Sequence, residues 1–124
     1  MEYNIFSVPA TTSTGPSSPG QFVDLNEKLV KNREATFFLR VNSEAMKEAG
    51  ISMGDVVIVD RSIKPENGKV VIVMFDGELI IRRLEIQNHK KRLLPASNRL
   101  SPIEISEGSF YSIWGVVTFV IHSM

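Results

Sequence analysis

A strand–turn–helix–strand pattern between Thr36 and Asp60 constrains the fold of this chain more than any other part of its sequence. The apolar residues Phe37, Leu39 and Val41 alternate with their neighbours, which predicts a β-strand with one buried face. The run 56–59 reads Val-Val-Ile-Val and predicts a second, buried strand. The stretch therefore predicts two strands of a sheet that are joined by a compact connection.

The connection between these two strands has a form in which active sites hold a nucleophile. Residues 42–44 are a short polar turn, residues 45–49 are long enough for about one turn of helix, and Gly50 can end that helix as a C-cap. A strand that ends in a turn and starts a helical segment is a place where a reacting side chain is often presented. Here the first helical position is Ala45, which has no group that could react.

Beyond Asp60 the sequence is almost entirely strand and turn. Asp76-Gly77 is a strong signal for a two-residue hairpin turn. Gly115 lies inside the last apolar run, where a glycine often marks a bend or bulge. The strands predicted in this part cover residues 70–75, 78–86, 93–94, 103–105 and 110–121, with a polar turn over 87–92. Many short strands joined by turns predict an all-β domain of twisted antiparallel sheets with one short helix.

The first part of the chain differs in composition from the rest. Residues 10–20 are small, polar and rich in glycine and proline, and such a run cannot bury enough apolar surface to order itself. Residues 22–34 suggest a short helix, which Asp24 could cap. We therefore expect a flexible N-terminal arm with a short helix over residues 1–34, and one folded domain over residues 35–124.

Composition argues against several classes of function. The 14 basic and 14 acidic residues leave no net charge, so we expect no direct nucleic-acid binding. There is no cysteine, which excludes disulfides and thiolate metal sites. No apolar run is long enough to span a bilayer, and neither a phosphate-binding loop nor a metal-ligand spacing is present. We therefore expect no cofactor, no metal ion, no membrane partner and a cytoplasmic location.

The segment between Val41 and Asp60 resembles the active-site region of the LexA-type self-cleaving peptidases, especially the UmuD branch. That family reads roughly Val-x-Gly-x-Ser-Met, then Gly-Ile-x-x-Gly-Asp, a hydrophobic run and Asp. This chain matches in register at Val41, Met46, Gly50-Ile51, Gly54-Asp55, Val56 to Val59 and Asp60. The segments Leu94 to Asn98 and Trp114 to Val117 are also similar to the family, so the resemblance covers residues from about 14 to 124. It implies a body of the LexA and signal-peptidase type.

The resemblance implies a serine–lysine peptidase, but this chain departs from the family at both reacting positions. The family serine falls on Ala45 and the family lysine falls on Arg82. A peptidase of this kind needs the serine to attack a carbonyl and a neutral lysine to take its proton. Alanine offers no nucleophile, and arginine is effectively always protonated in proteins. We therefore predict that the site is inactive.

The same resemblance implies roles for other residues. Ser43 stands where the family has a glycine, and Ser43, Glu44 and Met46 are candidates for the groove around Ala45. Ser43 could replace the nucleophile only with a base beside it, so we interpret its hydroxyl as a bonding group within the turn. UmuD-like chains are cut within the N-terminal arm, and the equivalent bond here is Thr14–Gly15.

Two functions follow from the resemblance. UmuD-like proteins form homodimers, bind a Y-family translesion DNA polymerase during the bacterial SOS response, and cleave themselves when a recombinase filament stimulates them. The first hypothesis is a non-catalytic homodimeric subunit that binds such a polymerase. The second is a self-cleaving peptidase whose nucleophile has been engineered to Ala45. The double departure favours the first, because trapping the uncleaved form needs one change and Arg82 would be superfluous.

Overall fold

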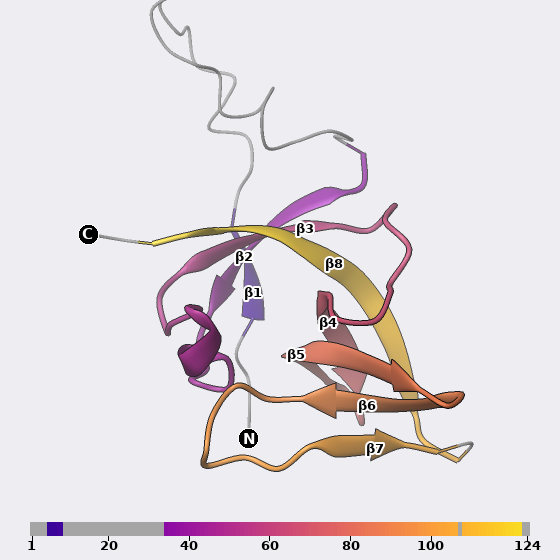
Figure 1. Cartoon of the computed structure of the whole chain (residues 1–124). Helices are drawn as coiled ribbons and strands as arrows, with labels where there is room; N and C mark the ends of the chain where they lie inside the picture. Colours follow the sequence, from indigo (N-terminus) through magenta and orange to yellow (C-terminus); the bar gives the residue numbers. More distant parts are fainter. Residues whose placement is uncertain (1–4, 9–33, 107, 123–124) are drawn as a thin grey trace, which may run out of the picture.

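A computed structural model describes residues 5–8, 34–106 and 108–122 of the 124-residue chain. The described residues form one eight-stranded sheet with the strand order β1-β2-β3-β8-β4-β5-β6-β7 (Figure 1). Every neighbouring pair is antiparallel, which confirms the predicted all-β fold. The elements in chain order are β1 (Ile5–Val8), β2 (Thr36–Val41), the 3-10 helix η2 (Lys47–Ala49), β3 (Val56–Asp60), β4 (Val70–Phe75), β5 (Glu78–Gln87), β6 (Lys90–Leu94), β7 (Ile103–Ile105) and β8 (Tyr111–Ile121).

The longest strand, β8, joins two groups of strands. Its second half, 116–121, pairs with β3, and its first half, 111–116, pairs with β4. The register with each partner shifts once, because Thr118 is an extra residue opposite β3 and Trp114 is an extra residue opposite β4. Bulges of this kind bend a strand and increase its twist. Figure 1 shows β8 curving from one group of strands to the other, which confirms the bend predicted near Gly115.

Gly115 lies beside the bulge at Trp114 because a side chain has no room there. A Cβ atom at this position would lie 2.5 Å from Cγ1 of Val59 and 3.3 Å from Cγ of Arg61. Arg61 is itself held in place, because its guanidinium lies 4.5 Å from the ring centroid of Trp114 and its Nε donates to the Trp114 carbonyl at 2.7 Å. The crossing of β8 over the end of β3 therefore requires glycine.

We expect Gly115→Ala to lower the free energy of unfolding by about 1–3 kcal/mol, because an added methyl group overpacks this crossing. Urea denaturation followed by fluorescence of the single tryptophan would measure the change. Gly108→Ala is the matched control, since a Cβ there has no atom within 4 Å. Equal stability of the two variants would contradict the steric account of Gly115.

Apolar side chains fill the space on both faces of the central strands. Successive residues of β4 point to opposite faces, so that Ile72 joins one cluster while Val71 and Val73 join the other. The first cluster comprises the buried residues Leu39, Val41, Met46, Ile51, Val57, Val59, Ile72 and Ile81. The second comprises Val71, Val73, Ile80, Leu84, Leu93 and Val116. Burial on both faces explains why β4 reads as a continuous apolar run.

Two tight hairpin turns set the register of the strands from β4 to β6. Asp76 and Gly77 both have positive φ, of 52° and 86°, which confirms the predicted two-residue turn. Asn88 and His89 also have positive φ, of 52° and 62°. The polar turn predicted over 87–92 was therefore too long: only two residues turn, and β6 begins at Lys90.

The N-terminal part of the chain contains a strand that the sequence pattern did not predict. β1 pairs with β2 at the edge of the sheet, with Ile5 opposite Val41 and Val8 opposite Phe38. The predicted helix over 22–34 falls almost wholly on residues 9–33, which lie outside the described part of the chain. The boundary between an arm over 1–34 and a domain over 35–124 stays a prediction.

Candidate functional site

The polar turn after β2 is held by the hydroxyl of Ser43. Its Oγ accepts a hydrogen bond from the N–H of Ala45 at 3.0 Å, as the sequence predicts for a serine in a turn. This bond keeps Ala45 outside the helix, so η2 begins at Lys47 and the predicted helical turn is two residues shorter than expected. Gly50 ends it in the left-handed conformation, with φ of 86°, which confirms the predicted C-cap.

The loop that follows β6 is fixed against this turn by three hydrogen bonds. The N–H of Ala96 donates to the carbonyl of Ala45 at 2.8 Å, and the N–H of Glu48 donates to the carbonyl of Ala96 at 2.8 Å. The carboxylate of Glu48 in turn accepts from the N–H of Asn98 at 3.1 Å. Two segments about 50 residues apart in the chain are thus held side by side by two backbone hydrogen bonds and one bond to a side-chain carboxylate.

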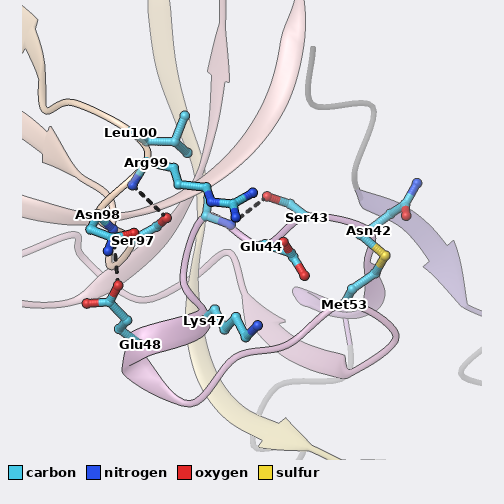
Figure 2. Close-up of a pocket in the computed structure, with 11 residues that line it drawn as sticks. Asn42, Ser43, Glu44, Lys47, Glu48, Met53, Ser97, Asn98, Arg99 and Leu100 are labelled. Atoms are coloured by element: carbon cyan, nitrogen blue, oxygen red, sulfur yellow. Dashed lines mark hydrogen bonds between the residues drawn. The ribbon is translucent and has the colours of Figure 1, made fainter.

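An open pocket of about 750 Å³ lies between the turn and this loop. Figure 2 shows the side chains of the two segments around it, with the Ser43 and Glu48 hydrogen bonds as dashed lines. Charged side chains at its rim balance, with Glu44 and Glu48 against Lys47 and Arg99. The lining residues are Asn42, Ser43, Glu44, Ala45, Lys47, Glu48, Met53, Ser97, Asn98, Arg99 and Leu100.

The structure brings some of the predicted site residues together and separates others. Ser43, Glu44 and Ala45 line the pocket. Met46, also expected in the groove, is fully buried in the first core cluster, because the tight turn directs it inward. Arg82 is buried on β5 with 4% of its surface exposed, does not line the pocket, and donates from Nη1 to the carbonyl of Ile81 at 2.8 Å.

The pocket offers hydroxyl groups but no nucleophile at the family position. The Ser43 hydroxyl is buried, with 5% of the residue exposed, and it is engaged with the backbone of Ala45. The other lining hydroxyl, that of Ser97, accepts from the N–H of Arg99 at 3.2 Å. Ala45 itself presents only a methyl group. Thr14 and Gly15, the equivalent of the cleaved bond, lie outside the described residues.

Sequence reasoning missed the residues that the second loop contributes. Ser97, Asn98, Arg99 and Leu100 form one side of the pocket, and Met53 extends another. The similarity of Leu94 to Asn98 to a family turn was a signal for that loop. It did not show that the loop packs against Ala45, because such a contact between distant segments leaves no local pattern.

The remaining acidic residues of the signature segment have structural roles. Asp55 accepts from the N–H of Ser52 at 2.8 Å and lies 2.8 Å from Nδ1 of His122. Asp60 accepts from the N–H of Ser62 at 2.8 Å. These bonds hold a turn and a strand end.

A second hollow, of about 690 Å³, lies at the far end of β5, β6 and β7. Arg92 contacts Glu85 there at 2.7 Å, and this hydrogen bond together with the charge of Glu85 raises the pKa of Arg92 above its ordinary value. Within the described residues, no group of three or more His, Asp or Glu side chains gathers as a metal site. No helix in that part of the chain is both long and apolar enough to cross a membrane.

The antiparallel all-β body and the pocket at the strand–turn–helix segment define a protein of the self-cleaving peptidase fold. The chain belongs to the Peptidase S24-like family, whose sequence profile matches residues 7–118. It is 40% identical over 107 residues to Protein ImpA of Escherichia coli, covering 82% of this chain and 69% of that protein. Protein SamA of Salmonella typhimurium is 38% identical over 102 residues, covering 81% and 69% of the two chains. Protein MucA of Escherichia coli is 33% identical over 112 residues, covering 86% and 76%.

These matches place the chain in the UmuD-like branch of the LexA/UmuD family. It is accordingly a UmuD-like protein of the SOS and mutagenesis class.

Proposed function

We propose that this chain is a non-catalytic UmuD-like subunit, which acts by binding rather than by cutting. The observation that carries the proposal is Ala45, a methyl group lining the pocket at the position of the family nucleophile. Arg82 stands at the position of the family base and supports the same proposal, because a guanidinium does not give up its proton in proteins. The chain therefore keeps the fold and the pocket but lacks both the nucleophile and the base that peptide cleavage needs.

The proposed partner is a Y-family translesion DNA polymerase, which a cytoplasmic homodimer of this chain would bind. The second half of the central strand β8 supports the dimer. Residues 117–121 of β8 pair with β3 on one side, whereas the pairing of β8 with β4 on its other side ends at Val116. Phe119 and Ile121 lie on this half of β8 and are 41% and 39% exposed. Among the residues that the structure describes, none pairs with this side of 117–121, and an apolar strand with such an edge is a template for pairing with a second copy.

A binding experiment tests the partner directly. The full chain is expected to co-elute in size-exclusion chromatography with a Y-family polymerase from the same bacterium, and not with the catalytic subunit of its replicative polymerase. Ala45→Ser should co-elute equally well, because binding does not need the nucleophile. A folded, dimeric chain that fails to retain the Y-family polymerase would overturn the proposed partner.

A further inference from the structure

We propose that Ser43 blocks peptide cleavage independently of the two missing groups, because its hydroxyl occupies the place where the carbonyl oxygen of a cleaved bond would bind. This inference rests on the proposed function, to which it adds a third obstacle. It begins with one hydrogen bond, in which the N–H of Ala45 donates to Oγ of Ser43 at 3.0 Å (Figure 2). Ala45 and Ser43 are 2% and 5% exposed, so water does not compete for this N–H.

The N–H of the nucleophilic residue has a defined task in acyl transfer. When a serine oxygen adds to the carbonyl carbon of a peptide bond and a base takes the serine proton, one electron pair of the C=O bond moves onto the oxygen, which becomes an oxyanion. Backbone N–H groups that already point at this oxygen stabilise its charge, and the nucleophile's own N–H is commonly one of them. The residue at that position here is Ala45, so its N–H is the donor that an oxyanion would need.

Ser43 already occupies the acceptor position of this N–H. A backbone N–H carries a single hydrogen, and its hydrogen bond weakens steeply when the acceptor leaves the N–H direction. An oxyanion has to lie at about 2.7–3.1 Å from the donor nitrogen, the same range in which Oγ of Ser43 lies. Two oxygen atoms cannot share that position. A carbonyl oxygen must therefore displace the buried hydroxyl or bind without this donor.

Position 43 decides whether this obstacle exists. The bond joins residues two apart in the chain, which is a pattern that serine side chains form in turns. The self-cleaving peptidases that this segment resembles have glycine at the position of Ser43, and glycine has no side chain to fill the place. The other lining hydroxyl, on Ser97, accepts from the N–H of Arg99 at 3.2 Å and so engages a different part of the pocket. Ser97 therefore offers a control.

A serine that accepts one hydrogen bond still has a hydrogen to donate, so the Ser43 hydroxyl has a second candidate role as a substitute donor. The geometry favours the blocking role. A substitute donor would hold the carbonyl oxygen one further hydrogen-bond length, about 2.7 Å, beyond Oγ and hence away from the residue that attacks. The two roles predict opposite effects: removal of a blocking hydroxyl speeds cleavage, whereas removal of a substitute donor slows it.

The first experiment uses the full chain with both reacting groups restored, Ala45→Ser with Arg82→Lys. Adding Ser43→Ala should raise the first-order rate of cleavage at Thr14–Gly15 by about 100-fold, because one oxyanion donor contributes roughly 10²–10³ to kcat. Adding Ser97→Ala instead, as the matched control, should leave the rate unchanged. Cleavage that appears only when Ser43→Ala is added supports the proposal as well. A rate that stays the same or falls with Ser43→Ala, including no cleavage in either variant, would overturn it.

Hydrogen exchange of the otherwise unchanged chain supplies a readout that does not depend on cleavage. Ser43→Ala should make the amide of Ala45 exchange at least about tenfold faster, whereas Ser97→Ala should not. The amide of Gly50, which donates to the carbonyl of Lys47 at 3.1 Å, reports that the turn keeps its shape; should Ser43→Ala lose this protection, Ser43→Gly is the second release variant. An Ala45 amide that stays protected without the hydroxyl would overturn the proposal.

Either failure differs from a failure of the proposed function. The proposed function fails when the unmodified chain cleaves itself or leaves the polymerase unbound, and neither observation involves a variant at position 43.

Discussion

Purified protein is expected to leave its Thr14–Gly15 bond intact, both at alkaline pH and with an activated recombinase filament. Ala45 offers no nucleophile, so no acyl-enzyme can form, and Arg82 offers no neutral state that could accept a proton. Each single restoration, Ala45→Ser or Arg82→Lys, should also be inactive, because groups that act as a unit lose most of their effect when either is absent. Mass spectrometry of the chain after prolonged incubation would measure this.

The double variant Ala45→Ser with Arg82→Lys is the informative one. A lysine at position 82 would stand where Arg82 is 4% exposed, and burial lowers the pKa of a lysine. Arg82 does not line the pocket, so cleavage by this variant requires the shorter lysine side chain to turn towards position 45. The neutral form of that lysine increases as the pH rises, so this cleavage should accelerate towards alkaline pH. The rate should exceed that of either single variant by at least about a thousandfold. An inactive double variant would show that the groove, and not only its chemistry, has changed.

One outcome would overturn the site assignment itself. If the unmodified chain, free of other proteases, produces a fragment that begins at Gly15, the nucleophile is not at position 45. Ser43 would then be the first residue to replace, since its hydroxyl lies 3.0 Å from the backbone nitrogen of Ala45. Ser43→Ala should abolish that fragment, whereas Ser97→Ala, which removes the other lining hydroxyl, should not.

The second large effect is expected in the dimer, where Phe119→Glu should weaken self-association by about 100-fold. Burying a phenylalanine contributes about 1.5–3 kcal/mol, and a two-fold interface contains each residue twice. The substitution also places a negative charge from each copy in an apolar interface, which is unfavourable. Analytical ultracentrifugation over a range of concentrations would measure the change.

Phe110→Glu is the matched control for this experiment. Phe110 is more exposed than Phe119, at 84% against 41%, but it lies in the connection before β8, away from residues 117–121. Its substitution should leave the dimer unchanged. If both variants stay dimeric, or if the wild type is a monomer at tens of micromolar, the β8 edge is not the interface.

Local patterns in the sequence were sufficient for most of the fold. Alternation and turn residues located the strands from Thr36 to Ile121, since hairpin signals such as Asp76-Gly77 act between neighbours in the chain. β1 was not predictable in this way. It has four residues, is followed by Pro9, and forms because β2, which begins 28 residues after β1 ends, offers it a free edge.

The pocket, too, was predictable only where it depends on residues that are neighbours in the sequence. Its first side follows from the segment around Ala45, where residue spacing identified the turn and the missing nucleophile. Its second side, from Ser97 to Leu100, depends on the bonds that hold Ala96 against Ala45 and Glu48. The inward direction of Met46 likewise depends on the detailed path of the turn, which residue spacing does not fix.

The position of β8 has a consequence for how this chain folds. β8 is the last of the described strands in sequence, yet it lies in the middle of the sheet, between β3 and β4. The strands made before it can form hairpins such as β4–β5 and β5–β6, but no hydrogen-bonded ladder links β3 to β4 until β8 is available. Pairing across some 60 residues, as between Ile58 and Phe119, closes slowly because the intervening chain must first be ordered. Until β8 has been made, the nascent chain therefore lacks Val116 in the second cluster and the partly buried Trp114, Val117 and Val120 that cover the first, so apolar surface of both clusters stays exposed.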